Sequence, residues 1–345
     1  MTNASPRDAQ FVLIGHPASY DHFVRLMETT GGDAAVGRLV EHRKSFEKLI
    51  EWMPPYFSRH AITFNTGSAK ISGRLIICPI LPEALLSLAA IKIAYTKVVQ
   101  ACNMAADAGA RVISLGGFTS IVLRGHDPGI EGVTITTGAS LTAALAVAQL
   151  ETAFATQARD LFAEPITVIG ATGDVGSVVS TLLAGRGCKL NLVARSRPEL
   201  ERLQAALPNS DITLSSKFDA ETSQSGAIVA ATNASSSLFD LSELATHTIL
   251  CDIGYPKTFA NAKPEESQEL RVFAGGIAQF PCDLGLQDYT ELNAGNLLFG
   301  CFTEGIILAA MAEMGIQGLY LGSAERAAGL LEQAKLLGVT PGPIN

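Results

Sequence analysis

Three glycines with regular spacing are the residues of this chain whose type and position most directly suggest a chemistry. They follow the apolar run Ile166–Ile169 and open the helical stretch Ser177–Ala184. A tight turn needs glycine, a diphosphate needs close approach of the backbone, and a helix N-terminus offers unpaired N–H groups to an anion. We therefore expect a phosphate-binding turn formed by Gly170, Ala171, Thr172, Gly173, Asp174, Val175 and Gly176.

The next predicted strand, Lys189–Ala194, carries a second signal at its end, where it runs into Arg195, Ser196 and Arg197. A strand on each side of a glycine turn is the context that favours a dinucleotide site over an ordinary turn. Enzymes that use NAD usually place Asp or Glu here to bind the ribose hydroxyls. A guanidinium binds phosphate through two hydrogen bonds, so this segment favours the 2′-phosphate of NADPH. Two solvated arginines without a ligand are the alternative.

One cysteine lies where a nucleophile would be activated. Cys301 occurs early in the apolar helical stretch Asn296–Met314, and Glu304 follows on roughly the same helix face. The positive end of a helix dipole stabilises a thiolate, although the effect fades beyond the first turn. Most cysteines of this kind are small buried core residues, and the local pattern alone favours that interpretation. The chain contains no C-x-x-C pair, which fits free thiols in a reducing compartment.

Three further segments follow predicted strands. Gly116 and Gly117 come after Arg111–Leu115, and their exposed N–H groups are candidates to hold an oxyanion or a carbonyl. Asp252–Lys257 and Gly275–Gly276 follow strands of the second half, at the edge where open α/β sheets bind ligands. Each of these segments also fits a plain turn.

Motifs for two other chemistries are missing from the sequence. The histidines show no metal-ligand spacing and no H-E-x-x-H segment is present, so we expect no catalytic metal. A G-x-S-x-G elbow is also absent, which leaves a hydrolase triad without support.

These segments need strands and helices to position them. After Pro165, apolar strands alternate with helical stretches, a pattern typical of a parallel, doubly wound sheet. The expected strands of this half are Ile166–Ile169, Lys189–Ala194, Ala227–Ala231, Thr248–Asp252 and Arg271–Ala274. The first half mixes strands such as Phe11–Gly15 with long helices such as Glu83–Gly109. We expect an α/β protein with an N-terminal α/β substrate domain and a Rossmann-like NADP-binding domain.

Length and composition agree with two domains. A chain of 345 residues exceeds what one hydrophobic core usually supports. An apolar content of 48% with 17% charged residues is typical of a globular enzyme. We expect a substrate domain over residues 1–150 and a dinucleotide-binding domain over 151–295. The C-terminal helices of residues 296–345 are expected to pack back toward the first domain and to carry Cys301.

Charge and polarity exclude several kinds of partner. A net charge of −8 argues against a nucleic-acid-binding surface. The first ten residues are polar and lack the apolar centre of a secretory signal. The longest uncharged run, Val133–Leu150, is too rich in Thr and Ser for a membrane-spanning helix. We expect a cytoplasmic protein without an integral membrane segment.

Taken together, these segments resemble the long-chain acyl-[acyl-carrier-protein] reductases of cyanobacteria, which make fatty aldehydes. The resemblance covers most of the chain and rests on the order and spacing of Leu13–His16, Leu81–Glu83, Leu115–Ile121, Thr136–Gly138, Gly170–Ser177, Gly254–Lys257, Gly275–Gly276 and Cys301–Glu304. It implies that Cys301 takes the acyl group from its carrier as an enzyme thioester, which hydride from NADPH reduces to the aldehyde. The resemblance therefore reverses the interpretation of Cys301, from a core residue to a nucleophile.

The resemblance also suggests roles for other residues. Covalent capture by a thiolate would hold the acyl carbon beside the nicotinamide. The N–H groups of Gly116 and Gly117 are candidates to bind the developing oxyanion, and Tyr255 or Lys257 is a candidate proton donor. An acidic carrier protein would need a basic landing site, although a solvated helix face is the alternative. The candidates for that landing site are Arg38, His42, Arg43, Lys44 and Lys48.

Two other functions stay open at this point. One is an NADP-dependent dehydrogenase of a small hydroxy or amino acid without a covalent intermediate, because the domain order resembles that of shikimate-dehydrogenase-like enzymes. The other is a non-catalytic protein that senses the nucleotide. The sequence also leaves open the acyl chain length, delivery by acyl carrier protein or coenzyme A, the oligomeric state, and assistance by a divalent cation such as Mg²⁺.

Overall fold

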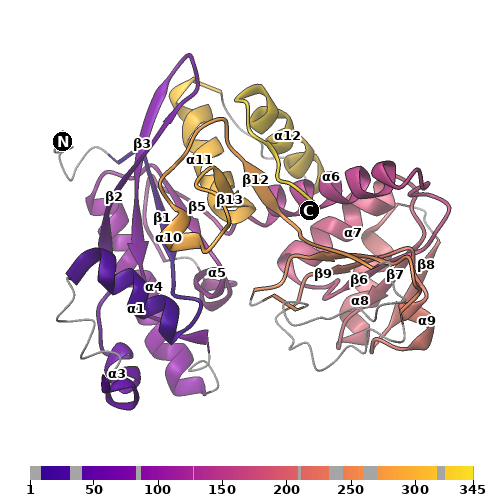
Figure 1. Ribbon diagram of the computed structural model, residues 1–345, viewed down its shortest axis with the longest axis horizontal. Helices are drawn as coiled ribbons and strands as arrows, with labels where there is room; N and C mark the ends of the chain where they lie inside the picture. The colour runs from indigo at the N-terminus through magenta and orange to yellow at the C-terminus, as the bar shows by residue number, and fades with distance from the viewer. Residues whose placement is uncertain are drawn as a thin grey trace. The chain divides into compact units, whose positions relative to one another are not determined.

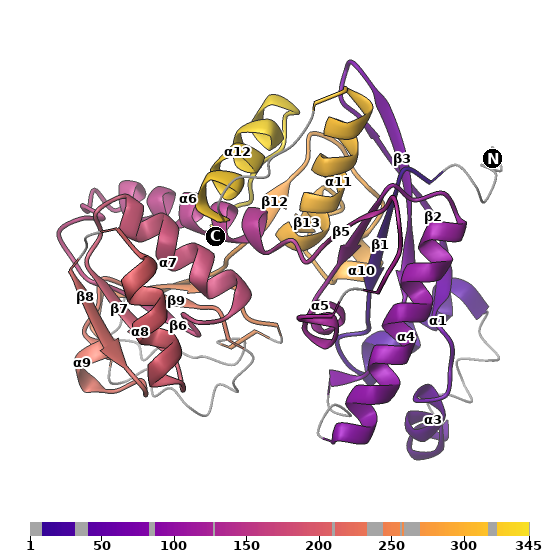
Figure 2. The ribbon, with the colours of Figure 1, turned by 180° about the vertical axis from the view of Figure 1, so that it is seen from behind.

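The computed structural model divides the chain into two compact units (Figure 1, Figure 2). It describes residues 9–31, 41–82, 87–126, 128–208, 211–232, 244–255, 257–258, 270–316 and 323–344. Unit 1 comprises residues 1–138 and 280–318, and unit 2 comprises residues 139–279 and 319–345. Each unit is therefore built from two separate segments, and the last part of the chain contributes to both.

Unit 1 contains a five-stranded sheet with the order β2-β3-β1-β4-β5. Its strands are β1 (Phe11–Gly15), β2 (Tyr56–Asn65), β3 (Lys70–Ile77), β4 (Val112–Leu115) and β5 (Thr134–Thr136). β1 pairs in parallel with β3 and β4, and β4 with β5, whereas the edge strand β2 runs antiparallel to β3. The carboxyl ends of β1, β3, β4 and β5 therefore share one edge of the sheet, where the following residues gather.

Helices from distant parts of the chain cover the two faces of this sheet. α4 (Leu88–Asp107) packs on the face that carries Ile113. α11 (Gly300–Glu313) packs on the opposite face, where Gly305 lies directly against Ser114. Neighbouring residues of a strand point to opposite faces, so Ile113 and Ser114 meet different helices.

Unit 1 also contains α1 (Tyr20–Gly31), α3 (Arg43–Ile50), α5 (Phe118–Leu123), α10 (Gln287–Thr290) and β13 (Leu297–Phe299). β13 leads directly into α11. Phe299, the residue before the helix, keeps an extended backbone with φ −62° and ψ 139°. Cys301 therefore lies in the first turn of α11.

Unit 2 contains a six-stranded sheet with the order β11-β10-β9-β6-β7-β8, in which all neighbouring strands run parallel. Its strands are β6 (Ile166–Ile169), β7 (Leu190–Val193), β8 (Ile212–Ser215), β9 (Ala227–Ala230), β10 (Ile249–Asp252) and β11 (Arg271–Ala274). The chain runs outward from β6 to β8 and returns to β9 on the other side of β6. This arrangement confirms the predicted doubly wound, Rossmann-like domain, whose ligands bind where the strand order reverses.

Helices of unit 2 pack against one face of this sheet. The helices of unit 2 are α6 (Ala139–Thr156), α7 (Asp174–Gly185), α8 (Arg197–Ala206), α9 (Ala220–Ser223) and α12 (Ser323–Leu336). One face, which includes Val168 and Val229, packs against residues of α6, α7 and α12. The other face forms a smaller core around Ile228 and Leu250. Near the chain end, β14 (Thr340–Pro341) pairs antiparallel with β12 (Ile277–Gln279).

The unit boundaries differ from the ranges expected from the sequence. α6 belongs to unit 2 rather than to a domain ending at residue 150, because Ala143, Ala146 and Leu150 pack into the core of the parallel sheet. Residues 280–295 belong to unit 1. The C-terminal range 296–345 is split, with α11 in unit 1 and α12 in unit 2.

Several local boundaries also differ. α11 begins at Gly300 rather than at Asn296, and β8 and α12 had no sequence prediction. Among the helices that the structure describes, none combines the length and apolar content that crossing a membrane requires.

Candidate functional site

The thiol of Cys301 lies at the amino end of α11, which no side chain caps. The first N–H groups of a helix have no partner within the helix. Here the N–H groups of Cys301 and Phe302, together with that of Gly117 after β4, are directed at the thiol and act to lower its pKa. The residue is half-buried. Three backbone donors therefore converge on one nucleophilic atom.

Burial works against ionisation of this thiol. It raises the pKa of Cys301 to about 11, the nearby Glu304 carboxylate adds to the increase, and the three N–H groups only partly oppose it. In the free protein the thiol therefore keeps its proton at neutral pH. Cys282 is exposed, whereas the remaining four cysteines are buried, so Cys282 and Cys301 are the thiols that reagents can reach.

Glycines let the first turn of α11 approach the sheet edge. Gly138, after β5, has φ +68°, and a Cβ there would lie 2.1 Å from the Cα of Cys301. A Cβ on Gly116 would lie 2.5 Å from the ring of Phe302, and one on Gly15 would lie 3.0 Å from the same ring. A side chain at Gly138 would push the backbone of Cys301 away from the sheet edge, and one at Gly116 would displace the ring of Phe302.

Side-chain hydrogen bonds fix this turn in place. The Ser114 hydroxyl donates to the carbonyl oxygen of Cys301. The Thr136 hydroxyl donates to Oε1 of Glu304 at 2.6 Å and accepts the N–H of Gly138 at 3.0 Å. Glu304 is only 1% exposed, and a buried carboxylate of this kind is costly without such a partner. The ends of β4 and β5 therefore both hold α11 through polar contacts.

A buried histidine holds the backbone next to Gly117. His16 follows β1, and its Nδ1 lies 2.8 Å from the carbonyl oxygen of Pro17. Its Nε2 accepts the N–H of Phe118 at 2.9 Å, which places the ring proton on Nδ1. Burial lowers the pKa of His16 to about 4, so the ring stays neutral. His16 therefore acts here as a fixed acceptor that orients the loop beside Cys301.

The structure separates the two glycines that the sequence paired as an oxyanion cradle. The N–H of Gly116 donates to the carbonyl oxygen of Ile14 at 2.9 Å, so sheet pairing occupies it. Gly117 has φ 58° and ψ −130°, a conformation for glycine, and its N–H faces Cys301. The donors that remain are those of Gly117, Cys301 and Phe302, whereas Gly116 serves the close packing of the Phe302 ring.

In unit 2, steric contacts explain why Gly170 and Gly176 of the predicted phosphate turn must be glycine. Gly170 has φ +78°, and a Cβ there would lie 2.3 Å from the carbonyl oxygen of Ala231. A Cβ on Gly176 would lie 2.1 Å from the carbonyl oxygen of Gly170, so glycine lets α7 pack onto the turn. Gly173 precedes α7 without a capping side chain. Ala171 is buried beneath this turn, and Thr172, Asp174 and Val175 line it half-buried. The turn fits a diphosphate at the helix N-terminus.

The two arginines after β7 differ in their contacts. Arg197 donates from Nε to Glu201 at 3.0 Å and from Nη1 to the carbonyl oxygen of Leu214 at 3.0 Å. Arg195 is exposed and makes no hydrogen bond or ion pair within the described part of the chain. Ser196 precedes α8 and makes no capping bond with its side chain. Arg195 and Ser196 are therefore the groups at this position that are ready to bind a phosphate.

Tyr255 and Lys257 lie beyond β10 in unit 2. The ammonium of Lys257 donates to the carbonyl oxygen of Asp252 at 2.8 Å, and Oδ1 of Asp252 accepts the N–H of Gly254 at 2.9 Å. The predicted site residues thus form two sets within the units. Gly116, Gly117 and Cys301 come together in unit 1, and Tyr255 and Lys257 belong with the nucleotide turn to unit 2.

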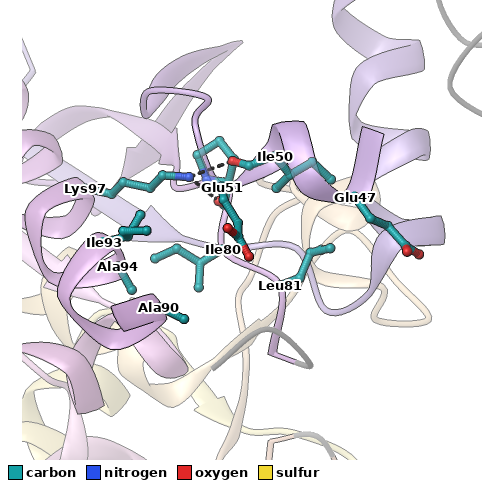
Figure 3. A pocket seen from close by; sticks show the side chains of 10 residues that line it. Glu47, Ile50, Glu51, Ile80, Leu81, Ala90, Ile93, Ala94 and Lys97 are labelled. Atoms are coloured by element: carbon teal, nitrogen blue, oxygen red, sulfur yellow. Dashed lines mark hydrogen bonds between the residues drawn. The ribbon is translucent and has the colours of Figure 1, made fainter. Parts of the chain in front are cut away.

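Unit 1 contains a pocket between α3, the segment after β3 and the start of α4 (Figure 3). Its volume is about 340 Å³, including space open to solvent, and Ile80, Leu81 and Ile93 give it a mainly apolar lining. The buried ammonium of Lys97 donates to the carbonyl oxygens of Ile50 and Pro79, both at 2.7 Å. Burial lowers the pKa of Lys97 to about 8. The lysine therefore ties α3 to the segment after β3.

Four residues of the Cys301 site had no role predicted from the sequence: His16, Ser114, Thr136 and Gly138. His16, Thr136 and Gly138 end or follow parallel strands at the shared carboxyl edge of the sheet, and that position is the sequence signal that could have identified them. Ser114 lies inside β4 and has no such signal. Within the described ranges, no group of three or more His, Cys, Asp or Glu side chains is arranged to hold a metal ion.

The Gly170–Gly176 turn lies at the strand reversal of a doubly wound sheet, the place where such folds bind their ligands. Comparison with known proteins gives the class of the protein as reductase. The chain is 30% identical to the long-chain acyl-[acyl-carrier-protein] reductase of Synechococcus elongatus over 317 residues, which cover 86% of this chain and 88% of that protein. The chain belongs to this reductase family.

Other similarities are partial or remote. The chain is 27% identical to the aminotransferase PigE of a Serratia species over 316 residues, which cover 87% of this chain but 36% of that protein. The solved structure of shikimate 5-dehydrogenase from Thermus thermophilus aligns with a TM-score of 0.40 and 13% identity, covering 94% of this chain and 100% of that one. The chain matches no protein-family model.

The close contact at Gly138 predicts a specific cost for a methyl group. Gly138→Ala should lower the free energy of unfolding by about 3 kcal/mol, because it adds a contact with the Cys301 backbone to the strain of positive φ. Gly132→Ala is the matched control, since Gly132 has φ +73° but no neighbour within 4 Å; it should cost about 1 kcal/mol. Urea unfolding measures both, and equal costs would contradict the proposed packing.

The raised pKa of Cys301 predicts how its reactivity depends on pH. The thiolate is the reactive form, so alkylation by iodoacetamide should accelerate about tenfold per pH unit from pH 7 to pH 9. The measurement uses a Cys282→Ser background, because Cys282 is the exposed competitor. Peptide mass spectrometry follows the modification, and a rate that is already constant at pH 7 would show that the pKa is lowered instead.

Proposed function

We propose that this protein reduces a fatty acyl thioester to the aldehyde, with NADPH as the reductant and an acyl thioester on Cys301 as the intermediate. The observation that carries the proposal is the convergence of three backbone N–H groups on the Cys301 thiol. Membership of the acyl-[acyl-carrier-protein] reductase family and the nucleotide turn of unit 2 support it.

In the first step the Cys301 thiolate attacks the carbonyl carbon of the acyl thioester. The carbon–sulfur bond to the carrier breaks, and the carrier leaves as its thiol after taking up a proton. The developing oxyanion lies next to the attacking sulfur, so the N–H groups of Gly117, Cys301 and Phe302 are placed to stabilise it. These donors are fixed in advance by His16 and by the start of α11.

When bound, NADPH supplies the hydride that the acyl carbon accepts in the second step. The bond between the acyl carbon and Cys301 Sγ then breaks, the aldehyde leaves, and the cysteine returns to its thiol form. The balance is one acyl thioester, one NADPH and one proton, giving one aldehyde, one carrier thiol and one NADP⁺. Tyr255 and Lys257 are the candidate proton donors on the side of the nucleotide domain.

The carrier of the acyl group is proposed to be acyl carrier protein, the carrier that the relative's name gives. Of the basic residues expected to meet such an acidic partner, Arg43 pairs with Asp21 and Glu47. Lys44 and Lys48 are exposed on α3, and Arg38 lies outside the described residues. Lys44 and Lys48 are therefore the residues to test by charge reversal, with KM for the carrier substrate as the measurement. An unchanged KM would mean that this face of α3 is only solvated and does not bind the carrier.

The free guanidinium of Arg195 predicts the cofactor preference. Arg195→Ala should weaken NADPH binding by about 10- to 100-fold and leave NADH binding unchanged, because a hydrogen-bonded charge pair with the 2′-phosphate is lost. Arg197→Ala is the matched control and should have the smaller effect, since Glu201 and Leu214 hold its guanidinium. Calorimetric titration with both nucleotides tests this, and equal losses for NADPH and NADH would refute the assignment.

Intact-protein mass spectrometry tests the covalent intermediate. After incubation with a long-chain acyl thioester without NADPH, Cys282→Ser protein should gain one acyl group, and the Cys282→Ser, Cys301→Ala double variant should gain none. Addition of NADPH should discharge the adduct as aldehyde. No adduct with several chain lengths and both carriers would favour a dehydrogenase of a small acid or a nucleotide-sensing protein. An adduct that NADPH does not discharge would contradict the reductase.

A further inference from the structure

Unit 2 contains a buried threonine hydroxyl that is separate from the phosphate turn and from Arg195. Thr142 is 9% exposed, and its hydroxyl oxygen has no hydrogen-bond partner. Among the buried side-chain nitrogen and oxygen atoms of the described residues, it is the one without a partner. A buried hydroxyl without a partner costs stability, so an unpaired one in a well-packed region indicates a group that binds there.

Thr142 lies in the first turn of α6, beside the segments that follow β10 and β11. Gly276 has φ +73°, and a Cβ there would lie 2.6 Å from Cγ2 of Thr142 and 3.7 Å from Cγ2 of Ile253. Glycine at 276 therefore lets the chain pass close to Thr142. Both Gly276 and Ile253 follow the carboxyl ends of parallel strands, so Thr142 lies at the ligand-binding edge of this sheet.

The surroundings of this hydroxyl are held firmly. The buried side chain of Gln149, two turns further along α6, accepts the N–H of Gly276 at 2.8 Å and donates to the carbonyl oxygen of Ala274 at 3.3 Å. It also donates to the carbonyl oxygen of Gly342 at 3.2 Å. Two hydrogen bonds with Gln149 thus hold the backbone turn beside Thr142, and a third ties the same side chain to Gly342. Loose packing therefore does not explain the unpaired hydroxyl.

The orientation of a dinucleotide on this sheet decides which part reaches Thr142. The diphosphate belongs at the Gly170–Gly176 turn after β6, and the adenosine with its 2′-phosphate belongs on the side of β7, where Arg195 lies. The nicotinamide half must then extend to the other side of the strand reversal, over the ends of β9, β10 and β11. Its carboxamide carries both a donor and an acceptor, and a threonine hydroxyl can pair with either.

We propose that the Thr142 hydroxyl binds the carboxamide of the nicotinamide ring, while its methyl group and Ile253 contact the ring itself. The inference rests on the proposed use of NADPH and adds the residue that orients the ring. A ring held at its carboxamide cannot rotate about its bond to the ribose. Thr142 therefore fixes which face of the ring packs against unit 2 and which face is left open for hydride transfer.

Calorimetric binding of two ligands to the unliganded protein tests this assignment. Thr142→Val keeps the shape of the side chain and removes the hydroxyl. It should weaken NADPH binding by about five- to tenfold, the loss of one hydrogen bond, and leave the binding of 2′-phospho-ADP-ribose, which lacks the nicotinamide, unchanged. Thr142→Ser keeps the hydroxyl and should retain NADPH affinity within about twofold.

The melting temperature of the free protein gives an independent readout. Thr142→Val should melt at the same temperature as the wild type or higher, because it removes a buried polar group without a partner. A lower melting temperature would mean that the hydroxyl is paired in the free protein and would overturn the proposal. Equal affinity losses for NADPH and 2′-phospho-ADP-ribose, or no loss for either, would also overturn it. Wild-type protein that binds neither ligand would instead contradict the proposed cofactor itself.

Discussion

The close approach of α11 to the sheet edge of unit 1 is the constraint on which the Cys301 site depends. A helix normally stands off a sheet by the thickness of its side chains, whereas Gly138 and Gly116 leave room for the backbone of Cys301 and the ring of Phe302. This approach brings the N–H of Gly117 to the same thiol that the first amides of the helix reach. The glycines make this close approach of α11 possible, and the hydrogen bonds of Ser114 and Thr136 to α11 keep the helix there.

In the proposed reaction, the backbone N–H groups around Cys301 would stabilise a substrate oxyanion, whereas the thiol of the free protein stays protonated. If the three N–H groups stabilised the free thiolate fully, the sulfur would be a weaker nucleophile, because nucleophilicity falls as the pKa falls. Burial instead keeps the pKa of Cys301 at about 11. In the proposed reaction the same donors are therefore available to the negative charge that develops on the substrate oxygen, where stabilisation would accelerate the acyl transfer.

The sequence predicted those features that depend on local chemistry. The glycine turn, the alternation of strands and helices in the second half, and the position of Cys301 near a helix start all follow from spacing and residue type. The start of α11 was misplaced because the apolar stretch from Asn296 runs through Phe299 without a capping residue. The occupied N–H of Gly116 and the membership of α6 in unit 2 depend on partners far away in the chain, Ile14 and the parallel sheet, which spacing does not encode.

His16 and Cys301 respond differently to pH, because burial shifts their pKa values in opposite directions. His16 has a pKa of about 4, lowered by burial, so it stays neutral as pH rises from 5 and keeps accepting the N–H of Phe118. The backbone at Gly117 is therefore constant over the range in which enzymes work. The pKa of Cys301 lies far above that range, so only a small fraction of the thiol is ionised. That fraction is what changes with pH at this site. In the proposed mechanism, the backbone geometry that would stabilise the oxyanion is therefore independent of pH, whereas the ionisation of Cys301 that would start the reaction is not.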